Sequence, residues 1–353
     1  MHFIIVGISH KTAPVEIRER FFLSINQRAH LLSVLKNDPS VAGAIILSTC
    51  NRVEIYAHTI DPDPECILQH LFNIRHLPGE SNYRQHFYAY LGKEAVYHLF
   101  KVASGVDSLI LGEKQILGQL RQAVELSRDN DLLSKDFNIL ANVAIKTGKK
   151  AQTETNIGCG GSSTSWAAVK MIQNLLGTLQ GKSVLIIGAG KMGKLAVAHL
   201  RNKGANKIYI MNRTMENSIA LAKEVNGIAV PFWDIKEVLS KVDACVCSTS
   251  CSHYIIEKSL VAQVISQREQ RPLILADIAM PRNIDPEVAS IGGVSLVDID
   301  DLVRAIDDIK KKRGEAIEQI EVIIAKKIGE FYRKLSINHE VNAARLREEL
   351  ILN

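Results

Sequence analysis

No stretch of eighteen apolar residues occurs in the 353-residue sequence, so no membrane-spanning helix is expected. The apolar run at residues 3–8 is too short for the core of a signal peptide, and no cleavage-site pattern follows it. Six cysteines without a secretory signal do not form the pattern of a disulfide framework. These absences argue against a secreted or membrane protein and predict a cytoplasmic one.

Motifs for several common chemistries are also missing. The sequence has no Walker A loop, no H-E-x-x-H pair and no signature of an RNA-binding module. Cys245, Cys247 and Cys251 lie near one another, but no second Cys/His pair completes a tetrahedral site. Ordinary buried thiols are therefore the favoured interpretation of these cysteines, and no metal is expected.

The composition is that of a folded chain with more than one domain. A length of 353 residues suffices for two or three domains, and 46% hydrophobic residues can fill sizeable cores. Charged residues make up 23% of the sequence, which argues against disorder. The net charge of +5 is compatible with a polyanionic partner but does not demonstrate one.

The most informative stretch is Leu47-Ser48-Thr49-Cys50-Asn51-Arg52-Val53-Glu54. Apolar residues 44–47 lead into it, and a second strand-like run, 53–57, leads out. Cys50 thus lies at the end of a predicted buried strand, where the backbone can hold a thiol at a cleft. Arg52 is two residues away, and a cation beside a thiol favours the nucleophilic thiolate. The alternative is a small buried hydrophobe, which the polar neighbours of Cys50 disfavour.

Residues 1–152 predict an α+β domain. Residues 3–8 are typical of a strand, and Ser24 is a suitable N-cap for a helix that runs to about Lys36. Two predicted strands then flank Cys50, and the remainder of the domain is predicted to be helical.

Two segments of this helical part each allow two interpretations. Residues 108–119 mix glycine, acid and amide within an apolar frame, which suits either a capped helix corner or a ligand site. Lys146, Lys149 and Lys150 form a basic cluster that is either a solvated helix face or a contact for phosphates.

Residues 153–294 predict a Rossmann-like domain. A Gly/Ser/Thr-rich segment, 153–165, marks its start. A strand at 182–187, a helix that runs to Lys203 and a strand at 207–211 then surround a G-x-G-x-x-G loop. Glycine at these positions allows the tight turn and the close approach of a pyrophosphate to a helix N-terminus. The predicted cofactor-binding residues of the loop are Gly188, Ala189, Gly190, Lys191, Met192 and Gly193.

The residues after the second of these strands predict which dinucleotide binds. An NAD site would place Asp or Glu there to bond the ribose 2′-hydroxyl, but the sequence has Asn212-Arg213-Thr214. Arg213 and Thr214 suit a 2′-phosphate, because arginine offers a bidentate fork. The three residues are therefore predicted to bind NADPH, and a surface arginine is the alternative for Arg213.

Residues 295–353 predict a long helix from Asp298 and a second, short helix after Asn338. Ile299, Leu302, Ile306 and Ile309 step at helical spacing, and a stripe rich in Ile and Phe follows the basic run 310–313, from Ile317 to Leu335. Pairing with a second copy would bury such a stripe, so a homodimer is expected. The alternative is that the stripe packs along its own domains.

These motifs, in this order, resemble the glutamyl-tRNA reductase family. The matching segments are 7–14, 47–54, 112–119, 153–158, 188–193 and 277–282. The resemblance covers nearly the whole chain, and the motifs around Cys50 and Gly112 are its most specific parts. Lys114 stands where the family usually has proline, and the helical dimerisation region that the family carries after the long helix is short here.

The resemblance implies a reaction and a set of site residues. The family reduces glutamyl-tRNA(Glu) with NADPH to glutamate-1-semialdehyde, the first step of the C5 route to tetrapyrroles, and the aminotransferase that acts next is a candidate partner. Cys50 would be the nucleophile of a thioester intermediate, and His98 would be important for activity. The residues implied to hold the glutamyl group are Thr49, Cys50, Asn51, Arg52, Ser108, Glu113, Lys114, Gln115 and Gln119.

The chemistry of the residues agrees with this reaction. An aminoacyl ester is already activated, so a thiolate can displace the tRNA without ATP or a metal. Arg52 could clamp the side-chain carboxylate of the substrate, and His98 could act as acid or base, unless it is a core histidine.

Three rival functions are weighed against it. A phosphorylating semialdehyde dehydrogenase would carry its nucleotide loop before the nucleophile, whereas Cys50 precedes Gly188. A shikimate-dehydrogenase-like oxidoreductase, or a tRNA-binding protein that senses NADP, would leave Cys50 without a role.

Overall fold

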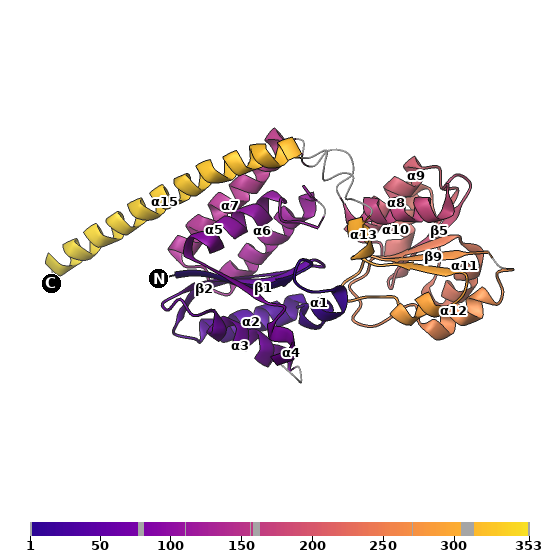
Figure 1. Ribbon diagram of the computed structural model, residues 1–353, viewed down its shortest axis with the longest axis horizontal. Helices are drawn as coiled ribbons and strands as arrows, with labels where there is room; N and C mark the ends of the chain where they lie inside the picture. Colours follow the sequence, from indigo (N-terminus) through magenta and orange to yellow (C-terminus); the bar gives the residue numbers. More distant parts are fainter. Residues whose placement is uncertain are drawn as a thin grey trace. The chain divides into compact units, whose positions relative to one another are not determined.

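The computed structural model describes residues 2–76, 81–109, 111–155, 157, 163–269, 271–304 and 314–351 (Figure 1). The chain forms two compact units. The first unit comprises Met1–Gly160 and Ile309–Asn353, and the second unit comprises Gly161–Asp308. The three domains expected from the sequence, 1–152, 153–294 and 295–353, stay a prediction. None of the helices in the described residues is both long and apolar enough to cross a bilayer.

The first unit is built on a four-stranded antiparallel sheet with the strand order β2-β3-β1-β4. Its strands are β1 (His2–Ser9), β2 (Val41–Ser48), β3 (Arg52–Thr59) and β4 (Tyr88–Leu91). Side chains alternate between the two faces along each strand, and both faces are apolar. Ile5 and Ile45 belong to one core cluster, whereas Ile4 and Ile46 belong to another. The sheet is therefore covered by helices on both sides.

The helices of the first unit are divided between the two apolar faces of this sheet. One face carries α1 (Val15–Phe21), α2 (Ile25–Lys36), α3 (Pro64–Arg75) and α4 (Ser81–Arg84), and the other carries α5 (Gly92–Ser104), α6 (Lys114–Asp129) and α7 (Lys135–Glu154) (Figure 1). The predicted start of α2 is confirmed, because Ser24 and Gln27 form a reciprocal capping box there. The sequence pattern thus placed β1, β2, β3 and α2 correctly, but it missed β4, which lies in a segment that was predicted to be helical.

The long C-terminal helix differs from the expectation in two ways. The structure has a short helix, α13 (Asp301–Arg304), and then α15 (Gly314–Ile351). Ile306, Ile309 and the basic run 310–313 lie outside the described residues. The predicted break after Asn338 is wrong, because α15 continues through it. Asn338 and His339 there bond the carboxylate of Asp136 on α7 at 2.7 Å each.

The apolar stripe of α15 faces its own unit. Ile320, Ile324 and Phe331 are fully buried in the core cluster that α5 and α7 also form. The ring of Phe331 packs edge-on against Phe3 of β1, with 5.8 Å between centroids. The expectation that the stripe is free to pair with a second copy is therefore wrong, and the alternative of packing within one chain is confirmed.

The second unit is a six-stranded parallel sheet with the order β10-β9-β8-β5-β6-β7. Its strands are β5 (Ser183–Ile187), β6 (Lys207–Met211), β7 (Ile228–Ala229), β8 (Ala244–Cys247), β9 (Leu273–Asp277) and β10 (Val294–Val297). This order is that of a dinucleotide-binding Rossmann fold, with the switch point between β5 and β8. The predicted Rossmann-like architecture is confirmed.

Helices and short 3-10 turns connect these strands. They are α8 (Thr164–Leu176), α9 (Lys191–Asn202), α10 (Met215–Val225), η2 (Phe232–Asp234), α11 (Ile235–Lys241), α12 (Lys258–Ile265) and η3 (Pro286–Ser290). Cys245 and Cys247 on β8 are fully buried, as predicted. Cys251 is not a buried thiol, because it is only partly covered and lies beside His253.

The docking of α15 predicts a difference between two variants of that helix. Phe331→Ala removes a buried ring and should lower the free energy of unfolding of the first unit by about 3–5 kcal/mol. Val341→Ala is the matched control, since Val341 is 61% exposed on the same helix, and should change it by less than about 0.5 kcal/mol.

Urea unfolding with two probes tests this prediction. Trp166 and Trp233 both lie in the second unit, so tryptophan fluorescence follows that unit, while circular dichroism at helical wavelengths follows both units. We expect Phe331→Ala to shift only the circular dichroism transition. Equal transitions for Phe331→Ala and Val341→Ala would show that α15 is not docked on its own unit.

Candidate functional site

Cys50 lies in the short turn that joins β2 to β3. The turn is closed by Thr49, whose backbone N–H donates to the carbonyl of Arg52 at 2.8 Å. The Thr49 hydroxyl oxygen accepts the N–H groups of Asn51 and Arg52, each at 3.2 Å. His10, the residue after β1, braces the turn, because its N–H donates to the carbonyl of Asn51 at 2.9 Å. The backbone therefore fixes the position of the thiol.

The thiol lines a small pocket in the first unit. The other lining residues come from the same turn and from the segment that leads into α6, and they are Thr49, Asn51, Arg52, Ser108, Glu113, Gln115, Ile116 and Gln119. The enclosed volume is about 20 Å³, which is the space of about one water molecule.

The structure thus brings together the residues that the sequence assigned to the glutamyl group. The side chain of Lys114 lies outside the described residues, and its role stays a prediction. Ile116 was missed, since an isoleucine one turn before Gln119 has the appearance of a core residue. Gly112 positions the segment: its φ is +75°, and a Cβ there would lie 2.3 Å from the carbonyl oxygen of Ile157.

Two polar atoms in the pocket lining are unsatisfied. The Oδ1 of Asn51 and the Nε2 of Gln115 are buried and have no hydrogen-bond partner within the described part of the chain. A buried polar group without a partner costs about 1–3 kcal/mol. The pocket therefore offers one acceptor and one donor to a polar ligand that would remove this cost.

Arg52 is buried and already paired. Its Nη1 donates to Glu54 Oε1 and to Asp107 Oδ2, both at 2.9 Å, and its Nη2 donates to the carbonyl of Asp107. Lys11 forms an ion pair with the other carboxylate oxygen of Asp107. Arg52 was predicted to clamp a substrate carboxylate. Its existing bonds hinder this contact, because both terminal nitrogens already donate to groups of the protein.

Glu54 is the centre of the buried network. It accepts hydrogen bonds from the hydroxyls of Tyr56 and Tyr88 and bonds His98 Nε2 at 2.7 Å, in addition to Arg52. Burial alone would raise the pKa of the Glu54 carboxyl, but the charges of Arg52 and His98 and these hydrogen bonds hold the pKa well below its usual range. Glu54 is therefore ionised at any physiological pH.

His98 faces Glu54 rather than the thiol. Its ring lies against Tyr90 and Tyr88, with centroid separations of 4.9 and 5.6 Å, and it is 9% exposed. Among the described residues, it is not part of the pocket lining. The geometry supports a contact that orients Glu54, and through it Arg52, more directly than proton exchange with Cys50.

The thiol itself is not activated in the free protein. Burial and the Glu113 carboxylate raise the pKa of Cys50 to about 12, and the opposing charges of Arg18 and Arg52 only reduce this effect. The expected effect of Arg52 on the thiol is present, but burial and Glu113 outweigh it, so the expected thiolate does not form in the free protein. Cys50 is a neutral thiol at neutral pH.

The glycine loop of the second unit has the geometry of a phosphate-binding turn. Gly188 has φ +110°, and a Cβ there would lie 2.8 Å from the carbonyl oxygen of Ser248. A Cβ on Gly193 would lie 1.9 Å from the carbonyl oxygen of Gly188. A Cβ on Gly190 would meet nothing within 4 Å, so this position faces open space at the first turn of α9. The first and third glycines serve packing, and the second leaves room for a ligand.

The residues after β6 lie at the same edge of the sheet. The N–H of Ala189 donates to Asn212 Oδ1 at 3.4 Å, which ties the loop to the end of β6. Arg213 and Thr214 are exposed, and Arg213 makes no hydrogen bond or ion pair with any residue that the structure describes. A guanidinium therefore lies beside the loop, and residues 212–214 contain no acid.

Sequence reasoning missed the buried residues that shape this edge. Asp277, at the end of β9, accepts three backbone N–H groups, from Ala279, Asn283 and Ile284. Burial raises the pKa of Asp277 to about 7 against these hydrogen bonds. The sequence signals were an acid at the end of an apolar strand and the family-like segment 277–282, and neither assigned a role to Asp277. Asp277 therefore holds the loop that follows β9.

The state of the thiol gives a testable prediction. In Glu113→Gln, loss of the carboxylate charge should lower the pKa of Cys50, so more thiolate is present at a given pH. Alkylation of Cys50 by iodoacetamide at pH 8 should become about threefold to tenfold faster, since one pKa unit changes the thiolate tenfold. Glu125→Gln, an exposed residue on α6, is the control and should leave the rate unchanged.

Mass spectrometry of the Cys50 peptide measures this rate. In the wild-type protein the rate should also keep rising up to pH 10, because the thiol is still protonated there. A plateau near pH 8, or a slower reaction in Glu113→Gln, would contradict the raised pKa.

Comparison with known proteins agrees with the two units. The family described as glutamyl-tRNAGlu reductase, N-terminal domain, matches residues 6–155, and shikimate / quinate 5-dehydrogenase matches residues 170–305. The chain is 40% identical over 333 residues to the glutamyl-tRNA reductase of Syntrophotalea carbinolica, covering 94% of this chain and 75% of that protein. It is 36% identical to the glutamyl-tRNA reductase of Aquifex aeolicus, covering 93% and 80%.

A solved structure gives the same result. The glutamyl-tRNA reductase of Methanopyrus kandleri is 31% identical, with a TM-score of 0.52 and coverage of 96% of this chain and 82% of that one. Sequence identity over three quarters or more of the length of these relatives decides the assignment. The chain belongs to the glutamyl-tRNA reductase family.

Proposed function

We propose that the protein reduces the glutamyl group of glutamyl-tRNA(Glu) to glutamate-1-semialdehyde, with NADPH as the reductant and release of the tRNA. This is the first step of the C5 route to tetrapyrroles. The observation that carries the proposal is the Cys50 pocket, in which a fixed thiol and two unsatisfied amide groups meet in a member of this family. The Rossmann-like unit supplies the place for the nucleotide.

Cys50 is the proposed nucleophile. Its sulfur attacks the ester carbonyl of the glutamyl group, the bond to the ribose oxygen of the tRNA breaks, and a thioester forms on Cys50. The thiol proton goes to the departing ribose oxygen, so the step is balanced. A nicotinamide cofactor held by the glycine loop and Arg213 would supply the hydride that reduces the thioester. With one proton, this releases the aldehyde and restores the Cys50 thiol.

The substrate can provide the activation that the free thiol lacks. An aminoacyl ester carries an α-ammonium group. Glu113 is the acid that raises the pKa of Cys50, and only burial has a larger effect. An ammonium bound beside Glu113 offsets that charge and lowers the pKa of the thiol. Asn51 Oδ1 is a second acceptor for the ammonium, and Gln115 Nε2 is a donor for a substrate oxygen.

Arg52 and His98 are assigned positioning roles in this mechanism. Arg52 joins the turn that carries Cys50 to Asp107 after α5, and His98 holds the Glu54 carboxylate that faces Arg52. Both residues therefore keep the pocket in shape. A role for His98 as acid or base in the reaction stays a prediction.

The residues present fit NADPH. Gly190 leaves room for the pyrophosphate at the N-terminus of α9, and Arg213 is exposed and unengaged beside the loop. The residues that would hold it are Gly188, Ala189, Gly190, Lys191, Met192, Gly193, Asn212, Arg213 and Thr214. The match of the second unit to a dehydrogenase family supports a pyridine nucleotide, and Arg213 supports the phosphorylated form.

Two proposed partners differ in their support. Lys146 and Lys149 are exposed on α7 and suit the phosphates of a tRNA, whereas Lys150 pairs with Glu154 at 3.5 Å. A homodimer and an interaction with the aminotransferase stay predictions. The stripe of α15 no longer supports the dimer, because it is buried within the first unit.

Replacement of the thiol tests the proposed reaction. Cys50→Ser should lower the rate of aldehyde formation from glutamyl-tRNA and NADPH by about three orders of magnitude or more, because a serine hydroxyl is a far weaker nucleophile. Cys251→Ser, at a partly covered thiol of the second unit, is the control and should keep the rate.

Both variants should still bind NADPH, which fluorescence titration of the nucleotide checks. Cys50→Ser with activity within tenfold of the wild type would refute the thioester route. Wild-type protein that binds NADPH but forms no aldehyde from glutamyl-tRNA would refute the function itself.

Arg213 gives a second test, on cofactor choice. Arg213→Ala removes a charged hydrogen-bond donor, which is worth about 1.5–3 kcal/mol. The KM for NADPH should rise about tenfold or more, while use of NADH should change little, since NADH has no 2′-phosphate. Lys207→Ala, at the opposite end of β6, is the control for loss of a positive charge. Equal effects of Arg213→Ala on NADPH and NADH would count against this role.

A further inference from the structure

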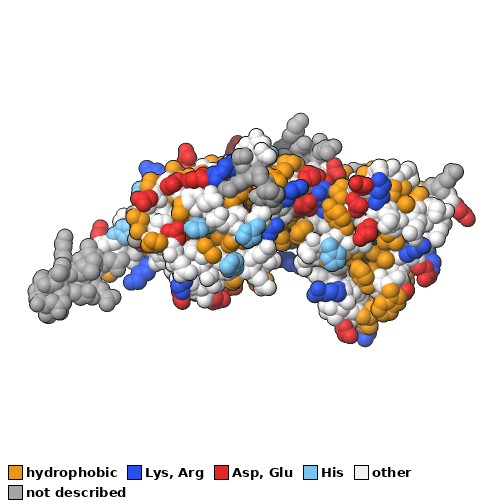
Figure 2. Space-filling model, turned by 90° about the horizontal axis from the view of Figure 1, so that it is seen from below, with side chains coloured by type: hydrophobic (Ala, Val, Ile, Leu, Met, Phe, Trp, Pro, Cys, Tyr) orange, Lys and Arg blue, Asp and Glu red, His pale blue; other side chains and the backbone are white. Residues whose placement is uncertain are grey.

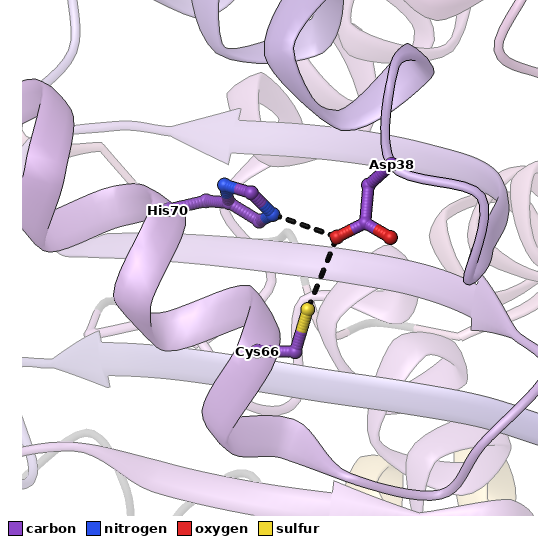
Figure 3. Close-up of side chains that lie close together, drawn as sticks. All are labelled: Asp38, Cys66 and His70. Atoms are coloured by element: carbon purple, nitrogen blue, oxygen red, sulfur yellow. Dashed lines mark hydrogen bonds and ion pairs between the residues drawn. The ribbon is translucent and has the colours of Figure 1, made fainter.

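A cluster of three metal-ligating side chains lies in the first unit, away from the Cys50 pocket. Figure 3 shows Asp38, which lies between α2 and β2, facing Cys66 and His70 on α3. The Oδ2 atom of Asp38 is 3.1 Å from Cys66 Sγ and 2.8 Å from His70 Nε2. The three ligand atoms lie within 4.8 Å of one another, and no other such group of three occurs in the part of the chain that the structure describes.

The local sequence builds this cluster. Cys66 and His70 are four residues apart on α3, so their side chains lie on one face of the helix. The other carboxylate oxygen of Asp38 accepts the N–H of Ser40 at 2.9 Å and its hydroxyl at 2.7 Å, which fixes the orientation of the carboxylate. Such secondary contacts are what hold a metal ligand in place.

The cluster is accessible from the solvent. The side chains of His70 and Asp38 are 23% and 16% exposed. Figure 2 shows the first unit from the side of α2 and α3, and histidine side chains there lie among charges of both signs. An ion can therefore reach the ligand atoms without a change in fold.

The donor set selects the metal. A thiolate, an imidazole and a carboxylate are ligands of tetrahedral zinc, with bond lengths of about 2.0–2.3 Å. Ionised Asp38 and Cys66 with neutral His70 carry two negative charges, which a divalent cation neutralises. We propose that Asp38, Cys66 and His70 bind one zinc ion, with water as the fourth ligand.

The same geometry disfavours a nucleophilic role for Cys66. The thiol donates its hydrogen to the Asp38 carboxylate rather than to the imidazole of His70. Burial and the contact with Asp38 raise the pKa of Cys66, and Asp63 contributes in the same direction. Negative charge around a thiol suppresses the free thiolate but attracts a cation, which takes the place of the thiol proton.

The position of the cluster makes the proposed ion structural. Asp38 lies just before β2 and Cys50 just after it, so the eight residues of that strand separate them by roughly 25 Å. The ion would cross-link the segment before β2 to α3, on one side of the sheet. It would stabilise the first unit and take no part in the reaction at Cys50.

Binding of zinc and cobalt to the full-length, metal-free protein tests the proposal. Calorimetry should show one Zn²⁺ per chain with a dissociation constant in the micromolar range or tighter. Cys66→Ser and His70→Gln should each weaken binding at least tenfold. Cys251→Ser is the matched control, because Cys251 also lies beside an imidazole, at 3.3 Å from His253, but in a pair rather than a group of three. That variant should bind as the wild type does.

Cobalt provides a readout that depends on the ligands themselves. Co²⁺ should give a sulfur-to-cobalt absorption band in the wild type and in Cys251→Ser, but not in Cys66→Ser. Circular dichroism confirms that the variants are folded, and Zn²⁺ should raise the melting temperature of the wild type but not of Cys66→Ser. The proposal would be overturned if both cluster variants bound zinc as the wild type does, or if the wild type bound no stoichiometric zinc. The three side chains would then form a hydrogen-bonded cluster only.

Discussion

The buried charge of Arg52 is the constraint on which the first unit depends. An arginine taken out of water must be compensated, because an unpaired buried charge costs several kcal/mol. Glu54 supplies one carboxylate from the same face of β3, and Asp107 supplies the other from the segment after α5. The pairs therefore tie the turn that carries Cys50 to the segment that leads into α6. The two walls of the pocket are held together by these contacts.

The same network bears on the state of the thiol. Two cations, Arg52 and Lys11, face two anions, Glu54 and Asp107, so these four charges cancel formally. Arg18 and Arg52 still lower the pKa of Cys50, but burial and Glu113 raise it more. The network thus fixes the position of the turn that carries Cys50 more than it lowers the pKa of the thiol. His98 belongs to the same network, because it bonds the Glu54 carboxylate instead of facing the thiol.

The sequence predicted where the site residues lie better than it predicted the protonation state of Cys50. The family resemblance was needed to assign the pocket lining, because the pattern at residues 108–119 alone left a capped helix corner open as an alternative. The glycine loop in its strand and helix context was sufficient to identify the Rossmann-like unit. The protonated state of the thiol was not predicted because Glu113, which raises its pKa, is far from Cys50 in the chain, and their proximity is visible only in three dimensions. The stripe of α15 was misread for the same reason, since periodicity shows that a face is apolar but not what covers it.

A protonated thiol in the resting protein is consistent with the proposed reaction. The thiolate is the form that oxidants and stray electrophiles attack, so a raised pKa protects Cys50 while the pocket is empty. The glutamyl ester brings its own cation, and Glu113 is placed to receive it because it already acts on the thiol through its charge. Binding and activation are then one event, and the selectivity of the site follows from its electrostatics. A carboxylic acid without an ammonium group would enter beside Glu113 with the wrong charge and leave the thiol protonated.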